Sequence, residues 1–396
     1  MKKTKVVIMV GLLLITIKSA FSQEWTSFPF VNEKKIIEFG WDLPPAQYVR
    51  DNIVSMEKRP FNGLIFSPGS KIPYIFKPVD YGVGTDYVDT LALKAIQWKK
   101  FTDNFLILWS GDDFGMSYFN NNQWDTILSN MKLIARSARI YRCKGINFDV
   151  EFYSKRSPWA FQDHADGHTL SEVKAKVRQR GREVMEAWQS EYPDIIILCQ
   201  YMFAYVPKRW DLLPDFMNGM LEAAGPKVRI IEGDEESYYW GTTNRWFDRY
   251  SELKSDIRNK RCDSTLFQKF DRQVQVGKSL YDSKVIRDKH TPLDKSRRWE
   301  HNVYIGLMTT DQYVLAYFER INWLVNTTPD LLPMGNKVSE PAPAWIEDGI
   351  SNARKKYAEK RALGWDMKGA VWSEGIVDTS LSVKIVSPKQ GREFLT

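Results

Sequence analysis

Two carboxylates alternate with apolar residues in the run Asn147-Phe148-Asp149-Val150-Glu151. Side chains on a strand alternate between its two faces, so we predict that Asn147, Asp149 and Glu151 share one face, with successive members about 6.5–7 Å apart. In a dry cleft the two carboxylates would repel each other, which raises the pKa of one of them. A protonated carboxyl beside an ionised one is what cleavage of a glycosidic bond requires. The alternative is a surface strand end whose acids are solvated.

A second group of acids, Glu232, Asp234, Glu235 and Glu236, follows another apolar run. With Asp149 as the electrostatic partner of Glu151, we predict that Glu232 is a further catalytic carboxylate and the alternative partner if it or a neighbour faces Glu151 across the barrel. Asp234 and Glu235 are predicted to contact the substrate. The separation of the two carboxyl groups would decide the stereochemistry: about 5–5.5 Å for retention and about 6.5–9.5 Å for inversion. A charged loop that caps the next helix and a divalent-metal site are the alternatives.

Further acids and aromatic residues stand where other apolar runs end. A flat aromatic ring can pack on the C–H face of a sugar, while acids and amides around it bond to the hydroxyls. Beside Asn147, Asp234 and Glu235, the predicted substrate contacts are Trp109, Asp112, Tyr201, Trp372 and Glu374. For each aromatic residue, ordinary packing is the alternative.

His164 and His168 lie four residues apart with acids between them. On a helix this spacing would place both imidazoles on one face, as a zinc site needs. Gly167 and the lack of helical periodicity instead favour a polar loop over the active face, so we predict no metal. No glycine-rich phosphate loop and no serine nucleophile elbow follows a strand, so the sequence predicts no cofactor.

Short apolar runs alternate with amphipathic stretches and predict the elements that position these residues. Most runs are apolar nearly throughout, as expected for parallel strands covered on both faces. The predicted strands are Ile36–Trp41, Gly63–Ser67, Phe105–Trp109, Gly145–Glu151, Ile195–Gln200, Val228–Glu232, Gln273–Leu280 and Gly369–Trp372. The predicted helices are Pro45–Lys58, Tyr87–Phe101, Gln123–Tyr141, Ser171–Tyr192, Asp211–Ala224, Asn244–Asn259 and Asp311–Val325. This order predicts a single-domain (βα)₈ TIM barrel with its active site at the carboxyl ends of the strands.

The alternation is less regular after residue 270. The charge-rich segment 282–301 indicates a loop insertion, and Val303–Met308 is an alternative to Gln273–Leu280 as strand seven. A surplus helix is predicted at Ala344–Leu363, and no helix is evident after strand eight.

Residues 144–151, Lys-Gly-Ile-Asn-Phe-Asp-Val-Glu, resemble the strand-four motif of family 18 glycoside hydrolases, the chitinases and their relatives, written Asp-Gly-x-Asp-x-Asp-x-Glu. The resemblance implies a TIM barrel with Glu151 as the general acid and Asp149 orienting a 2-acetamido group that attacks the anomeric carbon. It also implies that Trp372 forms the floor of the −1 subsite. Lys144 and Asn147 stand where the motif has Asp.

The first 22 residues have the composition of a secretory signal peptide. Lys2, Lys3 and Lys5 precede the apolar run Val6–Ile17, and Ala20-Phe21-Ser22 offers small residues at the cleavage point. The run is too short to span a bilayer comfortably and no comparable run follows, which predicts a secreted or periplasmic protein without a membrane span. We expect a hydrolase-like barrel at 23–376 and a C-terminal tail at 377–396.

Charge and cysteine content argue against other classes of protein. Removing the four lysines of the signal peptide from a formal net charge of +7 leaves +3, a balance that gives nucleic-acid binding little support. Three cysteines, Cys143, Cys199 and Cys262, do not make a disulfide-rich scaffold. The oligomeric state is not readable from the sequence.

These patterns favour a secreted glycoside hydrolase that cleaves an oligosaccharide or polysaccharide without a cofactor and uses Glu151 as its acid/base. A carbohydrate-binding barrel that has lost catalysis is the alternative, motivated by Lys144 and Asn147. A metal-dependent hydrolase that uses the acids at 232–236 with His164 or His168 is a third hypothesis.

Overall fold

The computed structural model describes residues 33–203, 210–240, 243–286, 292–323, 340–368 and 371–374, and at 284, 292–293, 340–341, 365–368 and 371–374 the backbone alone. The predicted signal peptide at 1–22 and the predicted tail at 377–396 lie outside these residues and stay predictions. Within the described ranges, no helix is both long and apolar enough to cross a membrane.

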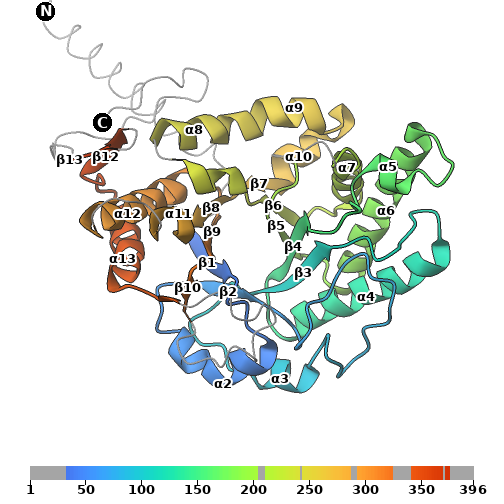
Figure 1. The fold of residues 1–396 in the computed structure, drawn as a ribbon, viewed down its shortest axis with the longest axis horizontal. Helices are drawn as coiled ribbons and strands as arrows, with labels where there is room; N and C mark the ends of the chain where they lie inside the picture. Colours follow the sequence, from blue (N-terminus) through green and yellow to red (C-terminus); the bar gives the residue numbers. More distant parts are fainter. Residues whose placement is uncertain are drawn as a thin grey trace, which may run out of the picture. The chain divides into compact units, whose positions relative to one another are not determined.

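Parallel strands surrounded by helices form the body of the described chain (Figure 1). The strands hydrogen-bond in the order β7-β6-β5-β4-β3-β2-β1-β9-β8, and every neighbouring pair is parallel. They are β1 (Lys35–Gly40), β2 (Gly63–Phe66), β3 (Phe105–Gly111), β4 (Gly145–Phe152), β5 (Ile196–Cys199), β6 (Arg229–Glu232), β7 (Val274–Val276), β8 (Lys278–Tyr281) and β9 (Tyr313–Phe318).

One continuous run of chain closes the barrel. β7 and β8, the outer strands of that order, are separated only by Gly277. β7 pairs with β6 and β8 pairs with β9, so Val274–Tyr281 is one strand that changes neighbours halfway. Asp311 fixes this change, because its carboxylate accepts the Val276 N–H at 2.7 Å and its own N–H donates to the Val276 carbonyl at 2.7 Å. Counted this way the barrel has eight strands, and the predicted TIM-barrel fold is confirmed.

The apolar faces of β4 explain how the strand presents its acids. Ile146, Phe148 and Val150 belong to the core that the helices cover, and the Phe148 ring lies 5.9 Å from Trp188 of helix α6 (Leu170–Glu191). Because alternate side chains point to opposite faces, residues 147, 149 and 151 face the barrel interior. A second apolar cluster fills that interior below them. The predicted shared face of strand four is confirmed.

Helices follow most strands and cover the outside of the barrel (Figure 1). Besides α6 they are α2 (Ala46–Met56), α3 (Thr90–Ala95), α4 (Asn121–Ile140), α5 (Phe161–His164), α7 (Leu213–Ala223), α8 (Thr243–Glu252), α9 (Arg258–Arg261), α10 (Phe267–Gln273), α11 (Asp282–Ile286), α12 (Pro292–Thr309) and α13 (Ala344–Ala358). Short turns of other helix types are η1 (Glu235–Tyr239), η2 (Leu253–Ile257) and η3 (Ser264–Leu266). α6 begins at a capping box in which Thr169 and Glu172 each bond to the other's backbone N–H.

The prediction for strand eight was wrong. Strand eight is β9, inside the segment Asp311–Val325 that was predicted to be a helix, and β9 pairs with β1 along its whole length. Its sequence, Tyr-Val-Leu-Ala-Tyr-Phe, is buried on nearly every side chain, and an apolar run of this length fits a helix or a strand. The predicted strand Gly369–Trp372 overlaps β13 (Val371–Glu374), which pairs antiparallel with β12 (Trp365–Lys368) in a separate two-stranded sheet.

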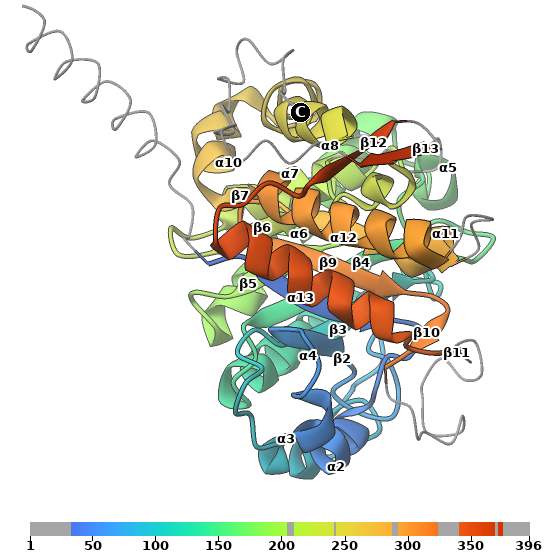
Figure 2. The same ribbon diagram turned by 90° about the vertical axis from the view of Figure 1, so that its left-hand side faces the viewer.

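Two helices precede β9, and a third follows it later in the chain. Val303–Met308, the alternative for strand seven, lies inside α12, and the predicted insertion at 282–301 holds α11 and the first half of α12. The surplus helix is α13, which supplies the missing helix after strand eight. α12 and α13 lie side by side, and the Trp299 indole N–H donates to the Ile346 carbonyl at 3.1 Å (Figure 2).

Candidate active site

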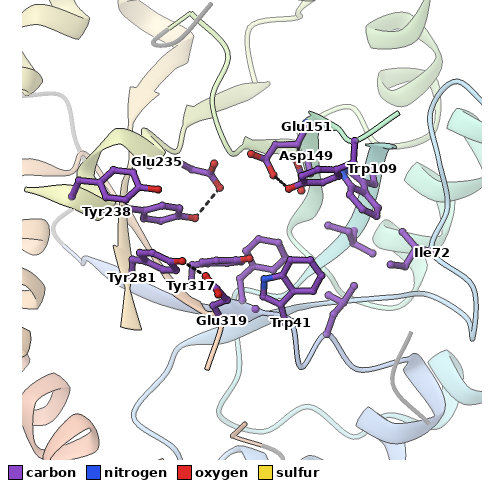
Figure 3. A pocket seen from close by; sticks show the side chains of 16 residues that line it. Trp41, Ile72, Trp109, Asp149, Glu151, Glu235, Tyr238, Tyr281, Tyr317 and Glu319 are labelled. Atoms are coloured by element: carbon purple, nitrogen blue, oxygen red, sulfur yellow. Dashed lines mark hydrogen bonds between the residues drawn. The ribbon is translucent and has the colours of Figure 1, made fainter. Parts of the chain in front are cut away.

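A pocket of about 260 Å³ opens at the carboxyl ends of the strands, where the fold predicts an active site (Figure 3). We call it the acid pocket. Its acidic lining residues are Asp149, Glu151, Glu235 and Glu319. Its aromatic lining residues are Phe39, Trp41, Trp109, Tyr153, Tyr238, Tyr239, Tyr281 and Tyr317. The pocket therefore combines carboxyl groups with flat apolar rings, as a carbohydrate site needs.

Strand β4 delivers Asp149 and Glu151 to this pocket. The Asp149 carboxylate accepts the backbone N–H of Glu151 at 2.9 Å, which holds the end of the strand rigid. Burial, followed by the nearby charge of Glu151, raises the pKa of Asp149 well above its usual range. Burial also raises the pKa of Glu151, while hydrogen bonds from the Tyr153 and Tyr201 hydroxyls act in the opposite direction.

Glu235 reaches the same pocket from η1, in the loop after β6. Asp234, just before η1, has φ +53°, and this left-handed residue turns the chain so that Glu235 enters the barrel mouth. Figure 3 shows the carboxyl groups of Glu235 and Glu151 extending into the same space from opposite sides. Burial, followed by the charges of Glu151 and Asp149, raises the pKa of Glu235 well above its usual range.

Two of the three carboxyls, those of Asp149 and Glu235, have a pKa raised well above the usual range, which favours their protonated forms. The charge of Glu151 raises the pKa of both Asp149 and Glu235, so a proton gained by Glu151 removes one of the charges that oppose ionisation of Glu235. The protons therefore belong to the group as a whole rather than to single residues. The pocket supplies both a carboxyl that can donate a proton and a carboxylate that can attack or activate water.

A tyrosine hydroxyl donates to each glutamate of the acid pocket. Tyr153 bonds to Glu151, Tyr238 to Glu235 at 2.8 Å, and Tyr281 to Glu319. The rings of Tyr238, Tyr281 and Tyr317 stack on one another, with centroids 4.8–5.7 Å apart and tilts of 18–29°. On the opposite wall, Trp109 stacks on Tyr74 at 5.7 Å. These stacks fix the rotamers of the side chains that hold the acids.

Removing the Tyr153 hydroxyl is expected to move one limb of the pH–activity profile. A hydrogen bond to an ionised carboxylate favours that form, so Tyr153→Phe raises the pKa of Glu151. If Glu151 must be protonated to act, the alkaline limb of kcat/KM shifts upward by about 0.5–1 pH unit, less than a fully buried charged hydrogen bond would give because Tyr153 is 65% exposed.

The shift is measured from kcat/KM between pH 4 and pH 10. Tyr87→Phe, which removes a hydroxyl bonded to Lys77 away from the pocket, is the matched control. If the acid limb moves instead, Glu151 acts as the base and Glu235 as the acid. If the profile does not change, the Tyr153 hydroxyl does not set the pKa of Glu151.

Glu232 and Asp234, predicted as a catalytic carboxylate and a substrate contact, do not line the acid pocket. Glu232 lies on the outer face of β6, where its carboxylate accepts the N–H groups of Met202 and Phe203 at 3.0 and 2.9 Å. Asp234 is fully buried and pairs with Lys278 at 2.6 Å and Arg249 at 3.0 Å. We therefore correct both assignments to structural roles.

The other predicted contacts are divided between the pocket and its surroundings. Trp109 and Glu235 line the pocket, and Tyr201 donates to Glu151 at 3.4 Å from behind it. Asn147 is buried below Asp149, donates to the Leu198 carbonyl at 3.2 Å and accepts from Gln200 at 3.3 Å, so it joins β4 to β5.

Asp112 and two residues near the C-terminus are not brought to the pocket lining. The Asp112 carboxylate accepts the next backbone N–H, that of Asp113, at 2.6 Å. Trp372 and Glu374 belong to β13, outside the barrel sheet, and their side chains lie outside the described residues.

Tyr281, Tyr317 and Glu319 line the pocket but were not among the predicted site residues. Tyr317 and Glu319 were missed because their segment was predicted to be a helix. The sequence contained the signal, because the apolar run ends in Tyr317 and Phe318 and is followed by Glu319. Other strands also end in aromatic and acidic residues. Tyr281 ends strand seven in the same way.

The two histidines have separate partners. His164 is buried with Nε2 3.1 Å from the Ser157 carbonyl, and the His168 ring stacks on Phe119 at 3.8 Å. In the part of the chain that the structure describes, no group of three or more His, Cys, Asp or Glu side chains is arranged to hold a metal ion.

No known family profile matches the sequence, and no curated protein matches it. Solved structures similar to the chain include a psychrophilic glycoside hydrolase family 10 endo-β-1,4-xylanase, at 9% identity and a TM-score of 0.47, over 81% of this chain and 97% of that one. They also include a GH113 β-mannanase from Alicyclobacillus acidocaldarius (11%, 0.45, 84% and 99%) and a GH18 chitinase from Pseudoalteromonas aurantia (10%, 0.41, 81% and 99%). The resemblance to family 18 at 144–151 stays a prediction. At these identities and TM-scores, the chemistry of this chain has to follow from its own side chains.

Proposed function

We propose that this protein is a glycoside hydrolase that cleaves an oligosaccharide or polysaccharide with Glu151 and Glu235 as its two carboxyl groups. The observation that carries the proposal is the convergence of Glu151, Glu235 and Asp149 on one aromatic-lined pocket at the mouth of the barrel (Figure 3). The aromatic walls suit the apolar faces of sugar rings. The predicted signal peptide supports action outside the cytoplasm, as a secreted or periplasmic enzyme.

In the proposed reaction Glu151 is the acid/base. Its proton passes to the glycosidic oxygen as the bond to the anomeric carbon breaks, and the leaving sugar departs with a hydroxyl group. The Glu235 carboxylate either attacks the anomeric carbon or takes a proton from the water that does. In the first case, water later releases the covalent intermediate, with Glu151 accepting its proton.

Asp149 has a supporting role in this proposal. Its raised pKa favours the protonated carboxyl, and in that form Asp149 donates a hydrogen bond to the reacting sugar. An acceptor at the second carbon of that sugar, a hydroxyl or the carbonyl of an acetamido group, is the expected partner. If cleavage depends on the acetamido group, the resemblance to family 18 at 144–151 would hold for the mechanism as well as for the sequence.

A glycan hydrolysis panel tests the proposed activity. Protein from residue 23 onward is incubated with α- and β-linked glycans, with and without 2-acetamido groups, and the products are identified by mass spectrometry. We expect cleavage of at least one class, reduced by at least about 10²-fold in the Glu151→Gln/Glu235→Gln double variant. Binding without cleavage would favour the non-catalytic barrel, and equal cleavage by the double variant would refute the assignment of both acids.

A further inference from the structure

Two exposed aromatic rings stand at the rim of the acid pocket. Tyr153 is 65% exposed and Tyr239 is 64% exposed, and both line the pocket. Among the aromatic side chains that the structure describes, every other one is buried or half-buried, and the remaining large exposed apolar residues are aliphatic. An exposed aromatic ring loses the free energy that burial would give it, so its restriction to this rim needs an explanation.

The two rings belong to opposite walls of the pocket. Tyr153 follows β4 and packs edge-on against Trp109 of β3, with centroids 5.5 Å apart. Tyr239 ends η1 and lies 6.2 Å from both Tyr238 and Tyr281. In Figure 3 Trp109 lies on one side of the pocket and Tyr238 and Tyr281 lie on the other. The strand order agrees, because β3 and β4 stand across the barrel from β8 and β9.

The proposed carboxyl pair lies between these walls. Glu151 is two residues before Tyr153, and Glu235 is in the same turn, η1, as Tyr239. A sugar unit on the Tyr153 side and another on the Tyr239 side would thus flank the bond that the acids cleave. Both tyrosines are positioned by neighbouring rings, so each offers an apolar surface that is ordered before a ligand binds.

The acids also restrict the charge of the ligand. The charge of Glu151 already raises the pKa of Asp149, and the charges of Glu151 and Asp149 raise the pKa of Glu235. A carboxylate or sulfate on a bound sugar would add a further negative charge to this group and oppose binding. Neutral sugars avoid that repulsion and can accept hydrogen bonds from the protonated members of the group.

We propose that Tyr153 and Tyr239 bind sugar units on the two sides of the scissile bond, so that the substrate is a chain of neutral sugars that crosses the pocket. This inference rests on the proposed hydrolase activity. It names two specificity-determining residues and predicts that affinity grows with chain length.

Binding of short and long oligosaccharides tests the inference. The probes are xylo-, manno- and chito-oligosaccharides of two and six units, titrated calorimetrically into the Glu151→Gln/Glu235→Gln variant. We expect the six-unit form of the cleaved glycan to bind at least tenfold more tightly than the two-unit form. Adding Tyr153→Ala or Tyr239→Ala should each weaken binding of the six-unit chain about tenfold, equal to about 1.4 kcal/mol.

Matched variants separate the ring from its hydroxyl and from general effects. Tyr153→Phe and Tyr239→Phe keep the rings and should retain most of the six-unit affinity. Leu91→Ala, on α3 and 80% exposed, removes an apolar side chain away from the pocket and should leave binding unchanged. In the active enzyme, the alanine variants should raise KM for the six-unit chain more than they lower kcat.

Two results would overturn the inference while leaving the hydrolase proposal standing. One is cleavage of a glycan whose two-unit and six-unit forms bind equally well. The other is cleavage of a six-unit chain that the alanine variants bind as tightly as the parent protein. If no probe is bound or cleaved, the inference and the proposed function fail together.

Discussion

Replacing Glu235 by glutamine is expected to lower kcat for glycan hydrolysis by about 10²- to 10⁴-fold, as is replacing Glu151. Glutamine keeps the size of the side chain but can neither donate a proton as an acid nor attack as a carboxylate. Because the two residues act in one reaction, the double variant should lose much less than the product of the two single losses.

The same substitutions should leave the fold intact or stabilise it. Three crowded carboxyls repel one another, so a neutral side chain at position 235 removes part of that repulsion. We therefore expect the thermal midpoint of Glu235→Gln to equal or exceed that of the parent protein. Loss of activity with a raised midpoint identifies a functional group rather than a structural one.

Glu236→Gln provides the control for Glu235→Gln. Glu236 lies in the same turn, η1, but pairs with Arg249 at 3.0 Å and does not line the acid pocket. Its kcat should match that of the parent protein. If Glu236→Gln and Glu235→Gln have the same activity, Glu235 is not the second carboxylate.

Asp234→Ala is expected to lower the free energy of unfolding by about 3–5 kcal/mol. Asp234 is fully buried and is the shared partner of two buried cations, Lys278 at 2.6 Å and Arg249 at 3.0 Å. Removing the carboxylate takes from the buried Lys278 the anion that it contacts, while Arg249 keeps Glu236 at 3.0 Å and Glu252 at 3.2 Å. The pKa of Lys278 is already lowered by burial, and its deprotonation would limit the loss.

Urea denaturation at constant pH measures this effect. Asp234→Asn, which tolerates the left-handed backbone and can still accept a hydrogen bond, should lose less than Asp234→Ala. Asp86→Ala breaks the exposed Lys71–Asp86 pair instead and should leave the midpoint unchanged. A loss below about 1 kcal/mol in Asp234→Ala would mean that the buried ion pair does not hold this loop.

The strand that carries Asp149 and Glu151 could be predicted because two independent signals coincide. Its apolar residues alternate with polar ones, which assigns the faces, and a fold with parallel strands assigns the end at which the site forms. β9 had only an apolar run, which does not distinguish a helix from a strand. Its partner, β1, lies far away in the sequence, since Lys35 pairs with Tyr313. No local sequence pattern predicts that pairing.

Glu235 shows a different limit of sequence reasoning. Strand alternation pairs Glu232 with Asp234, and the prediction placed both on the inner face, whereas Ile231 fills the barrel interior and Glu232 lies on the outer face. The alternation ends in the structure, because β6 stops at Glu232 and Asp234 adopts a left-handed conformation. A turn of this kind depends on the ion pairs that hold Asp234, and those partners come from β8 and α8.

The pairing of β1 with β9 has a consequence for how the chain is made. Until residues 313–318 emerge from the ribosome, β1 keeps an unpaired edge of backbone N–H and carbonyl groups. A nascent or truncated chain that ends before β9 therefore exposes this edge, together with that of β8, and both are templates for pairing with another chain. Completion of the barrel protects the protein against such aggregation, and that protection arrives only after β9 has been synthesised.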